Sequence, residues 1–323
     1  MSNMLIKNNP LISVVMSVYN GEAFLEEAIN SVLNQSLTNF EFIIINDGST
    51  DSSLKIIKSF TDSRIKIINQ KNLGLSKALN KGIKEANGKF IARMDSDDIS
   101  LPLRFEKQID FLNKNPNCVL VGTNAHIIDL KGNLLYTTKL AENWTDIKKI
   151  LPENTFFHSA TMFPKSVWAR SGGYREDIIH HFEDKILWNN FSKFGELYNL
   201  SDALLCYRLV PTSVSNHNSK TIQLLKEISN RIILTDKVTD KDIFTLKTTS
   251  QVNIRNKLGN YYLRLGTIYL ENNFNRTNAI INFLKCIRYS PLLPSAYFNL
   301  FLALLPKKNI WQWKNWRKSS LKN

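Results

Sequence analysis

The sequence has 323 residues, a formal net charge of +14 and three cysteines. A chain of this length can bury a large core, which excludes a peptide-sized binding module and predicts one large domain with an appendage or two domains. The cysteines Cys118, Cys206 and Cys286 stand far apart, which excludes a paired zinc motif or a disulfide framework and favours a reduced, cytosolic setting. No signal peptide and no run of ~18 apolar residues is found, so we expect the protein to face the cytoplasm.

The positive charge is concentrated in the last third of the chain. Residues 1–219 carry 24 Lys and Arg against 23 Asp and Glu, a net charge of +1, whereas residues 220–323 carry 18 against 5, a net charge of +13. A polar, turn-prone segment, PTSVSNHNS, separates the two parts. We therefore predict a first domain over residues 1–218 and a basic helical region over residues 219–323.

Predicted strands and helices alternate through the first hundred residues. Apolar, largely β-branched runs predict strands at Leu11–Val18, Phe40–Asn46, Arg64–Asn69 and Lys89–Met94. The segments between them predict helices at Glu22–Gln35, Ser52–Phe60 and Leu75–Ala86. Continuous apolar strands separated by helices favour an α/β fold with a mainly parallel sheet covered on both faces. Ligands of such sheets bind at the carboxyl ends of the strands.

Polar side chains follow three of these strands, at Ser17–Asn20, Asp47 and Asp95–Asp98. Asp47 alone could close a turn and cap the next helix, and an isolated Asp-x-Asp is common in exposed loops. The three clusters together favour a ligand site. Asp95 and Asp97 are two residues apart, which in extended chain places both side chains on one side, where they can share Mg²⁺ or Mn²⁺. Such a cation keeps positions open for phosphate oxygens, which predicts a diphosphate ligand.

Several motifs then occur in one order along the chain: ISVVMSVYNGEAFLEEAINSVLNQS, FEFIIINDGSTD, NLGLSKALNKGI, ARMDSDDISLPLRFEKQ, HSATMF with SGGY, and EDKILW. With these motifs the chain resembles the family 2 inverting glycosyltransferases, which use nucleotide-sugar donors and have the GT-A fold, a Rossmann-like α/β fold. The resemblance covers about Leu11–Ser215, so the predicted first domain becomes a GT-A catalytic domain.

The resemblance implies which residues hold the donor and the metal. In similar enzymes the end of the first strand and the acid of the Asp-Gly-Ser turn hold the nucleoside, which points to Ser17, Tyr19 and Asp47, with Asp47 accepting from the base. Asp95 would approach the ribose or the metal, and Asp97 would hold a divalent cation, Mn²⁺ or Mg²⁺, on the diphosphate.

The pair Glu183-Asp184 resembles the acidic motif whose second residue is the catalytic base, so Asp184 is predicted to deprotonate the acceptor hydroxyl. A carboxylate can activate the acceptor oxygen while a cation stabilises the leaving diphosphate, and attack opposite the leaving group inverts the anomeric configuration. The same pair could be only the acidic first turn of a helix, and both interpretations can hold together. Asp98 is either a supporting ligand or a helix cap.

Four positions depart from the family pattern or stay open. Leu79 stands where many members have arginine, so Lys77 becomes the candidate cation near the diphosphate, with a solvated helix-face lysine as the alternative. Ile186 replaces an acid two residues after the base, and Val210 stands where relatives often have a histidine near the metal. His158 either lines the acceptor side or is a structural histidine with its hydrogen bonds satisfied.

The C-terminal third is predicted to be helical. The segment Tyr261–Pro291 has apolar residues at helical spacing with a polar break at Glu271–Asn275, and it resembles one tetratricopeptide-type helix pair. The segment Leu300–Asn323 combines three tryptophans with six cations and no acid. This composition favours peripheral contact with an anionic membrane, or alternatively a solvated basic tail whose tryptophans pack on the helices.

The sequence therefore predicts a cytoplasmic-face enzyme, a hexosyl- or N-acetylhexosaminyltransferase. It would transfer a sugar from a nucleotide diphosphate donor, UDP-linked in our prediction, to a glycan or lipid-linked glycan in surface polysaccharide or lipopolysaccharide synthesis. Two other classes stay open. One is a nucleic-acid-binding protein that uses the basic C-terminal region, although no recognised nucleic-acid module occurs and we expect no nucleic acid partner. The other is a scaffold with a degenerate transferase domain.

Overall fold

The computed structural model describes residues 9–151, 155–178, 181–211, 213, 219–250, 253–272 and 275–306. The chain forms two compact units: unit 1 comprises Met1–Ile127, Thr137–Arg208 and Lys226–Leu246, and unit 2 comprises Ile128–Tyr136, Leu209–Leu225 and Lys247–Asn323. The sequence predicts a domain boundary after residue 218, and residues 214–218 next to that boundary lie outside the described part of the chain. That boundary therefore stays a prediction.

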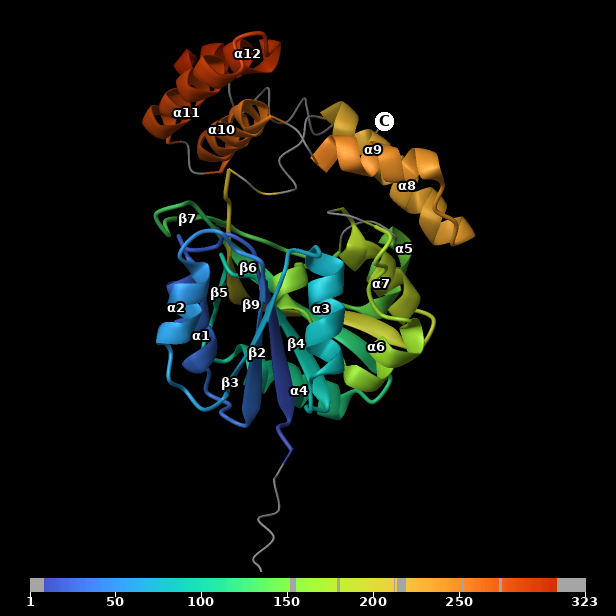
Figure 1. Cartoon of the computed structure of the whole chain (residues 1–323). Coiled ribbons are helices and arrows are strands. Elements are labelled where there is room, and N and C mark those ends of the chain that lie inside the picture. Colours follow the sequence, from blue (N-terminus) through green and yellow to red (C-terminus); the bar gives the residue numbers. More distant parts are fainter. Residues whose placement is uncertain are drawn as a thin grey trace, which may run out of the picture. The chain divides into compact units, whose positions relative to one another are not determined.

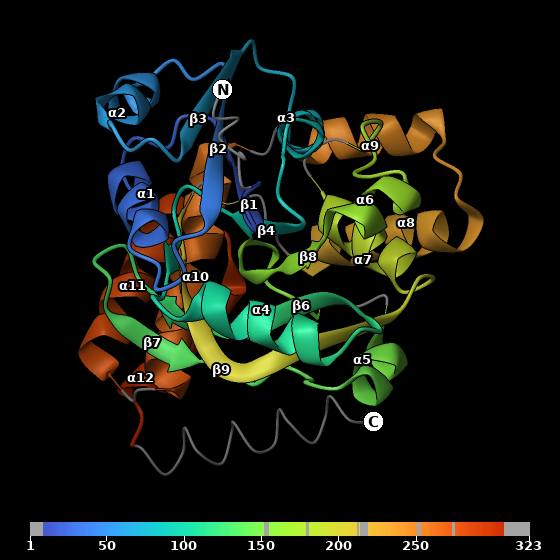
Figure 2. The same cartoon turned by 90° about the horizontal axis from the view of Figure 1, so that it is seen from below.

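The described residues form a curled sheet that lies in unit 1 except for most of β7, which belongs to unit 2 (Figures 1 and 2). The strands are β1 Ile12–Val18, β2 Phe40–Asp47, β3 Ile65–Gln70, β4 Phe90–Met94, β5 Ile99–Ser100, β6 Cys118–Ile128, β7 Leu134–Thr137, β8 Met162–Pro164 and β9 Glu196–Arg208. Eight of them follow the order β3-β2-β1-β4-β8-β6-β9-β5. The pairs among β1 to β4 are parallel, and β8 pairs antiparallel with β4 and β6, as β9 does with β5.

The helices of the described residues are α1 Leu25–Leu33, α2 Ser53–Ser59, α3 Leu75–Lys84, α4 Arg104–Lys114, α5 Trp144–Ile150, α6 Lys165–Ser171, α7 Glu183–Phe191, α8 Ser219–Thr235, α9 Asp240–Ser250, α10 Ile254–Glu271, α11 Arg276–Tyr289 and α12 Pro294–Leu304, with a 3₁₀ turn at His158–Ala160. Helices α1 and α2 lie on one face of the parallel strands and α3 lies on the other (Figure 2). The four predicted strands and three predicted helices of the first hundred residues are all confirmed.

Three of the parallel strands, β1, β2 and β4, are buried on both faces, which explains their continuous apolar sequence. β1 and β4 are buried along almost their whole length. Helix α3 packs on β1 and β2, and a Cβ added at Gly82 in that helix would lie 2.6 Å from the side chain of Ile45 and 2.8 Å from that of Val15. A glycine there lets the helix approach the sheet closely.

Unit 2 contains the predicted helix pair. Helices α10 and α11 meet at the predicted polar break, where the side chain of Asn275 caps α11 by accepting a hydrogen bond from the N–H of Asn278 at 3.0 Å. The two helices approach closely, since a Cβ added at Gly266 would lie 2.6 Å from the ring of Phe283. Of the predicted segment Leu300–Asn323, residues 307–323 lie outside the described part of the chain. Among the described residues, no helix has the length and apolar character required for a membrane crossing.

Candidate active site

The carboxyl ends of β1, β2 and β4 meet at one edge of the sheet, as the sequence predicts. The register pairs Val18 with Asn46, and Met16 with Met94. The loops that follow β1 and β2 are bonded to each other: the N–H of Asn20 donates to Ser49 Oγ at 3.1 Å, and Asn20 Oδ1 accepts from the N–H of Thr50 at 2.8 Å. The loops that carry the predicted nucleoside-binding residues are thus held together before any ligand binds.

Asp47 is buried at the end of β2 and accepts three hydrogen bonds. Its Oδ1 accepts from Gln70 Nε2 at 2.7 Å and from the N–H of Leu73 at 2.9 Å, and its Oδ2 accepts from the N–H of Gly74 at 2.9 Å. The loop after β3 therefore closes on this carboxylate. Ser17 is half-buried at the end of β1. Tyr19 is exposed beside it.

Lys77 is exposed on the first turns of α3, whereas Leu79 is fully buried in the core. A pocket of about 220 Å³ lies beside the loop that closes on Asp47. Its lining residues are Asn72, Leu73, Gly74, Leu75, Ser76, Lys77, Glu176 and Ile178. The lysine thus borders a cavity next to the Asp47 carboxylate, as the candidate-cation interpretation requires.

Asp95, Asp97 and Asp98 form a tight acidic cluster after β4. Each offers a carboxylate oxygen, and the three oxygens lie within 4.8 Å of one another. Asp98 is buried and accepts hydrogen bonds from Ser159 Oγ and, at 2.9 Å, from the N–H of Arg208. The helix-cap interpretation of Asp98 is wrong, because β5 intervenes and the residue preceding α4 is Leu103.

Three buried arginines surround this cluster. Arg93, in β4, forms an ion pair with Asp95. Arg104, at the start of α4, donates from Nη2 to the carbonyl of Arg93 at 2.8 Å. Arg208, at the end of β9, donates from Nε to the carbonyl of Asp97 at 3.0 Å. The sequence interpretation missed all three, although each is a single charge beside or within an apolar run.

Glu183 and Asp184 begin α7, immediately after Phe182, which has a left-handed backbone (φ 43°). Asp184 Oδ1 accepts a hydrogen bond from the N–H of Lys185 at 2.7 Å. Both acids stand in the first turn of α7, where they face the positive end of the helix dipole, in agreement with the helix-terminus interpretation. The charges of Arg93 and of Asp95 both act on this pair, so it lies within electrostatic reach of the acidic cluster.

His158 lies beside this pair and hydrogen-bonds through one ring nitrogen. Its Nε2 shares a hydrogen bond with the Tyr174 hydroxyl at 2.6 Å, and its Nδ1 lies 4.0 Å from Glu183 Oε1. Burial, helped by Arg93, holds the pKa of His158 well below its usual value, so the ring is neutral at pH 7. These contacts favour the structural interpretation of His158.

Tyr174 is positioned by Asn80 of α3, a contact that joins two of the quoted motifs. Asn80 Nδ2 donates to the carbonyl of Tyr174 at 2.8 Å, and Asn80 Oδ1 accepts from the N–H of Tyr174 at 2.9 Å. The preceding Gly173 has φ 74°, and a Cβ there would lie 2.9 Å from Asn80 Oδ1, so the turn requires glycine.

Comparison with known proteins agrees with this geometry. The "Glycosyl transferase family 2" model matches residues 13–170. The O-antigen biosynthesis glycosyltransferase WbnJ of Escherichia coli is 38% identical over 218 residues, which cover 65% of this chain and 82% of that protein. This chain belongs to glycosyltransferase family 2.

Two solved structures resemble the transferase in fold. S. aureus TarS 1–349 in complex with UDP superposes with a TM-score of 0.52 at 19% identity, covering 87% of this chain and 91% of that one. The mannosyltransferase PcManGT from Pyrobaculum calidifontis, in complex with GDP-Man and Mn²⁺, gives a TM-score of 0.53 at 14% identity. The superposition covers 96% of this chain and 84% of that one. The predicted GT-A fold is confirmed.

Four carboxyl groups of the candidate active site of the transferase have raised pKa values. Burial and the charge of Asp95 raise the pKa of Asp97 to about 7. Burial and Asp184 raise the pKa of Glu183 to about 7, and burial also raises the pKa of Asp184. Burial and its two neighbours raise the pKa of Asp98 well above the usual range. Binding of a cation or a proton stabilises such a site, because the added positive charge offsets the repulsion between the carboxylates.

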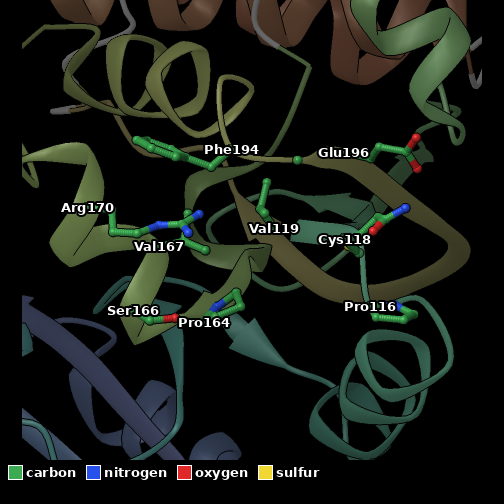
Figure 3. Close-up of a pocket in the computed structure, with 11 residues that line it drawn as sticks. Pro116, Cys118, Val119, Pro164, Ser166, Val167, Arg170, Phe194 and Glu196 are labelled. Atoms are coloured by element: carbon green, nitrogen blue, oxygen red, sulfur yellow. The ribbon is translucent and has the colours of Figure 1, made fainter.

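A second, larger pocket of about 500 Å³ has Pro164, Val167 and Phe194 among its lining residues (Figure 3). Pro164 lines it and pairs with Phe90 at the start of β4, whereas the acidic cluster follows the end of that strand. The guanidinium of Arg170 lies 4.6 Å from the ring centre of Phe194 on its wall. This pocket is therefore separate from the candidate active site, in spite of its size.

Proposed function

We propose that this transferase moves a sugar, with inversion, from a UDP-linked donor to a hydroxyl of a glycan or lipid-linked glycan in the synthesis of a cell-surface polysaccharide. One observation carries the proposal: Asp47, the three-carboxylate cluster and the Glu183-Asp184 pair stand around one edge of a GT-A sheet. The O-antigen enzyme of Escherichia coli among the relatives supports the polysaccharide acceptor.

The nucleoside would lie over the ends of β1 and β2. Asp47 can only accept hydrogen bonds when ionised, so it fits a base that presents an N–H, as uracil does. Ser17 and Tyr19 end the neighbouring strand and would contact the same nucleoside. Lys77 borders the adjacent pocket and would meet the diphosphate charge. The UDP complex of TarS supports a uridine donor.

The acidic cluster would hold a divalent cation, Mn²⁺ or Mg²⁺, with Asp97 and Asp95 as its ligands. Six carboxylates (Asp95, Asp97, Asp98, Glu183, Asp184 and Glu27, which pairs with Arg208) and three arginines (Arg93, Arg104 and Arg208) give a formal net charge of −3. Carboxylate oxygens are the ligands that these cations prefer, and one divalent ion would offset most of this charge. When bound, the ion stabilises the negative charge of the leaving diphosphate. The Mn²⁺ complex of PcManGT supports this cofactor.

Asp184 would act as the base. The acceptor oxygen attacks the anomeric carbon from the face opposite the diphosphate, the carbon–oxygen bond to the phosphate breaks, and the hydroxyl proton passes to Asp184. One displacement inverts the anomeric configuration and requires no covalent intermediate. The raised pKa of Asp184 makes it a better proton acceptor than an exposed aspartate. The positive charge of Arg93, which also acts on Asp95, favours the ionised form of Asp184.

A thermal-shift panel of nucleotides and nucleotide sugars, each with and without Mn²⁺, tests the proposal. We expect UDP with Mn²⁺ to stabilise the protein, by about 2.7 kcal/mol at a ligand concentration of 100 times Kd. Asp97→Ala should abolish the metal-dependent part of this shift. The matched control is Asp110→Ala, which removes an exposed carboxylate paired with Lys114 on α4, and it should keep the whole shift. A panel without any shift for folded wild-type protein would overturn the proposal.

A further inference from the structure

Helix α12 exposes an apolar stripe that the transfer reaction does not use. The helix contains no charged residue. Tyr297, Phe301 and Leu304, at helical spacing of four and three, are 48%, 58% and 65% exposed. The opposite side of the helix is packed, with Ala296, Leu302 and Ala303 buried. We call the three exposed residues the α12 stripe.

Large apolar side chains near α12 are exposed as well. Leu292, in the turn before the helix, is 93% exposed. Helix α11 packs against α12 and lies beside it (Figure 1). On α11, Ile281 and Leu284 are exposed, whereas Lys285 lies over the ring of Tyr262 on α10, 5.3 Å from its centre. Large exposed apolar side chains gathered on one helix face, as in the α12 stripe, are typical of an interaction surface.

The charge of these helices indicates the partner. Residues 253–306 contain six Lys and Arg (Arg255, Lys257, Arg264, Arg276, Lys285 and Arg288) and one acid, Glu271. The sequence that follows, residues 307–323, adds six more cations, three tryptophans and no acid. A positively charged surface with exposed aliphatic and aromatic side chains complements an anionic lipid bilayer, in which the side chains enter the interface and the cations meet the head groups.

We propose that the α12 stripe is the surface through which unit 2 binds an anionic lipid bilayer. The preference for a bilayer over another protein rests on the proposed function, because an acceptor with a lipid anchor would bring the enzyme to a membrane surface. The side chains of the stripe would insert into the apolar part of the bilayer, and the basic residues would bind negatively charged head groups. A bilayer with phosphatidylglycerol offers both an apolar interior and negative head groups, whereas one of phosphatidylcholine offers only the apolar interior.

Liposome flotation of the full chain tests the proposal. Vesicles contain either phosphatidylcholine with phosphatidylglycerol or phosphatidylcholine alone. We expect wild-type protein to float with the anionic vesicles, to float at least about tenfold less with neutral vesicles, and to lose binding as salt rises. The double substitution Phe301→Asp/Leu304→Asp should reduce binding to anionic vesicles by about tenfold or more. Its control is Phe244→Asp/Leu234→Asp, which changes the same residue types at exposed positions of unit 1 and should float like wild type.

Circular dichroism and light scattering accompany the flotation. If the stripe variant, with wild-type helix content, floats like wild type, the proposal is overturned. It is also overturned if deletion of residues 307–323 abolishes flotation while the stripe variant keeps it, because the tail would then be the membrane anchor. A wild-type dimer that the stripe variant converts to a monomer, without flotation of either, would identify a self-association surface instead. The nucleotide thermal shift reports separately on the donor site, so a flat panel with intact flotation would overturn the proposed function and leave bilayer binding standing.

Discussion

Replacing Asp97 with asparagine should stabilise the metal-free protein and abolish its metal response. The pKa of Asp97 is raised to about 7 by burial and by Asp95, whereas an ordinary aspartate has a pKa near 3.9. A carboxyl with a higher pKa in the folded than in the unfolded state binds its proton more tightly when folded. The free energy of unfolding of wild type therefore falls as the pH rises from about 4 to about 7.

The size of the effect follows from the two pKa values. One pKa unit corresponds to about 1.4 kcal/mol, so ionising Asp97 in the folded protein costs up to about 4 kcal/mol at pH 8. At pH 5 the cost is less than half of this, because Asp97 stays protonated in the folded protein and only the unfolded chain ionises. An asparagine has the same shape and no charge, so the Asp97→Asn protein does not lose the free energy that ionisation of Asp97 costs the folded wild type.

Differential scanning fluorimetry in EDTA at pH 5 and pH 8 measures this difference. At pH 8, Asp97→Asn should melt about 5 to 10 °C above wild type, and the gap should narrow at pH 5. Adding Mn²⁺ at pH 8 should raise the melting temperature of wild type and leave that of the variant unchanged. Asp110→Asn, at an exposed ion pair, should change stability by less than about 0.5 kcal/mol at both pH values. If Asp97→Asn were no more stable than wild type at pH 8, the electrostatic account of the cluster would be refuted.

Three further substitutions test the site and the sheet that carries it. Asp184→Asn should lower kcat by about 10²- to 10⁴-fold in a donor-turnover assay while the UDP thermal shift is kept; loss of both would point to misfolding. Arg104→Met removes the buried donor to the carbonyl of Arg93 and should lower the free energy of unfolding by about 2 to 4 kcal/mol in urea titration. An unchanged midpoint would show that this hydrogen bond does not stabilise the fold. Gly88→Ala places a Cβ 2.5 Å from the backbone nitrogen of Ser13 and should cost about 1 to 3 kcal/mol, which a melting curve equal to that of wild type would disprove.

The parallel half of the sheet could be predicted because continuous apolar runs between helices indicate strands that are buried on both faces. Strands β1, β2 and β4 are buried on both faces, so each had to be an uninterrupted apolar run. The long strand β9 shows the opposite case, since the run LLCYR covers only its end and the strand begins at Glu196. The earlier part of β9 includes polar and exposed residues such as Ser201 and Asp202, which leaves no continuous apolar run to detect.

The carboxylates of the candidate site could be predicted from the sequence, whereas the arginines that surround them could not. Asp47 and Asp95 follow strands directly, and the strand-end rule brings such residues together from sequence alone. Arg208 reaches the cluster from 110 residues further along the chain, through its hydrogen bond to Asp98. That contact depends on the antiparallel pairing of β9 with β5, which short-range patterns do not encode.

Arg208 also concentrates several supports of the acidic cluster in one residue. Its backbone N–H donates to Asp98, its Nε donates to the carbonyl of Asp97, and its guanidinium pairs with Glu27 of α1. The end of β9 is thus joined to the loop after β4 and to helix α1 through a single side chain. A substitution that shortens this side chain would therefore remove the attachments to Asp97 and to Glu27 at once, whereas a substitution at Glu27 would remove only one.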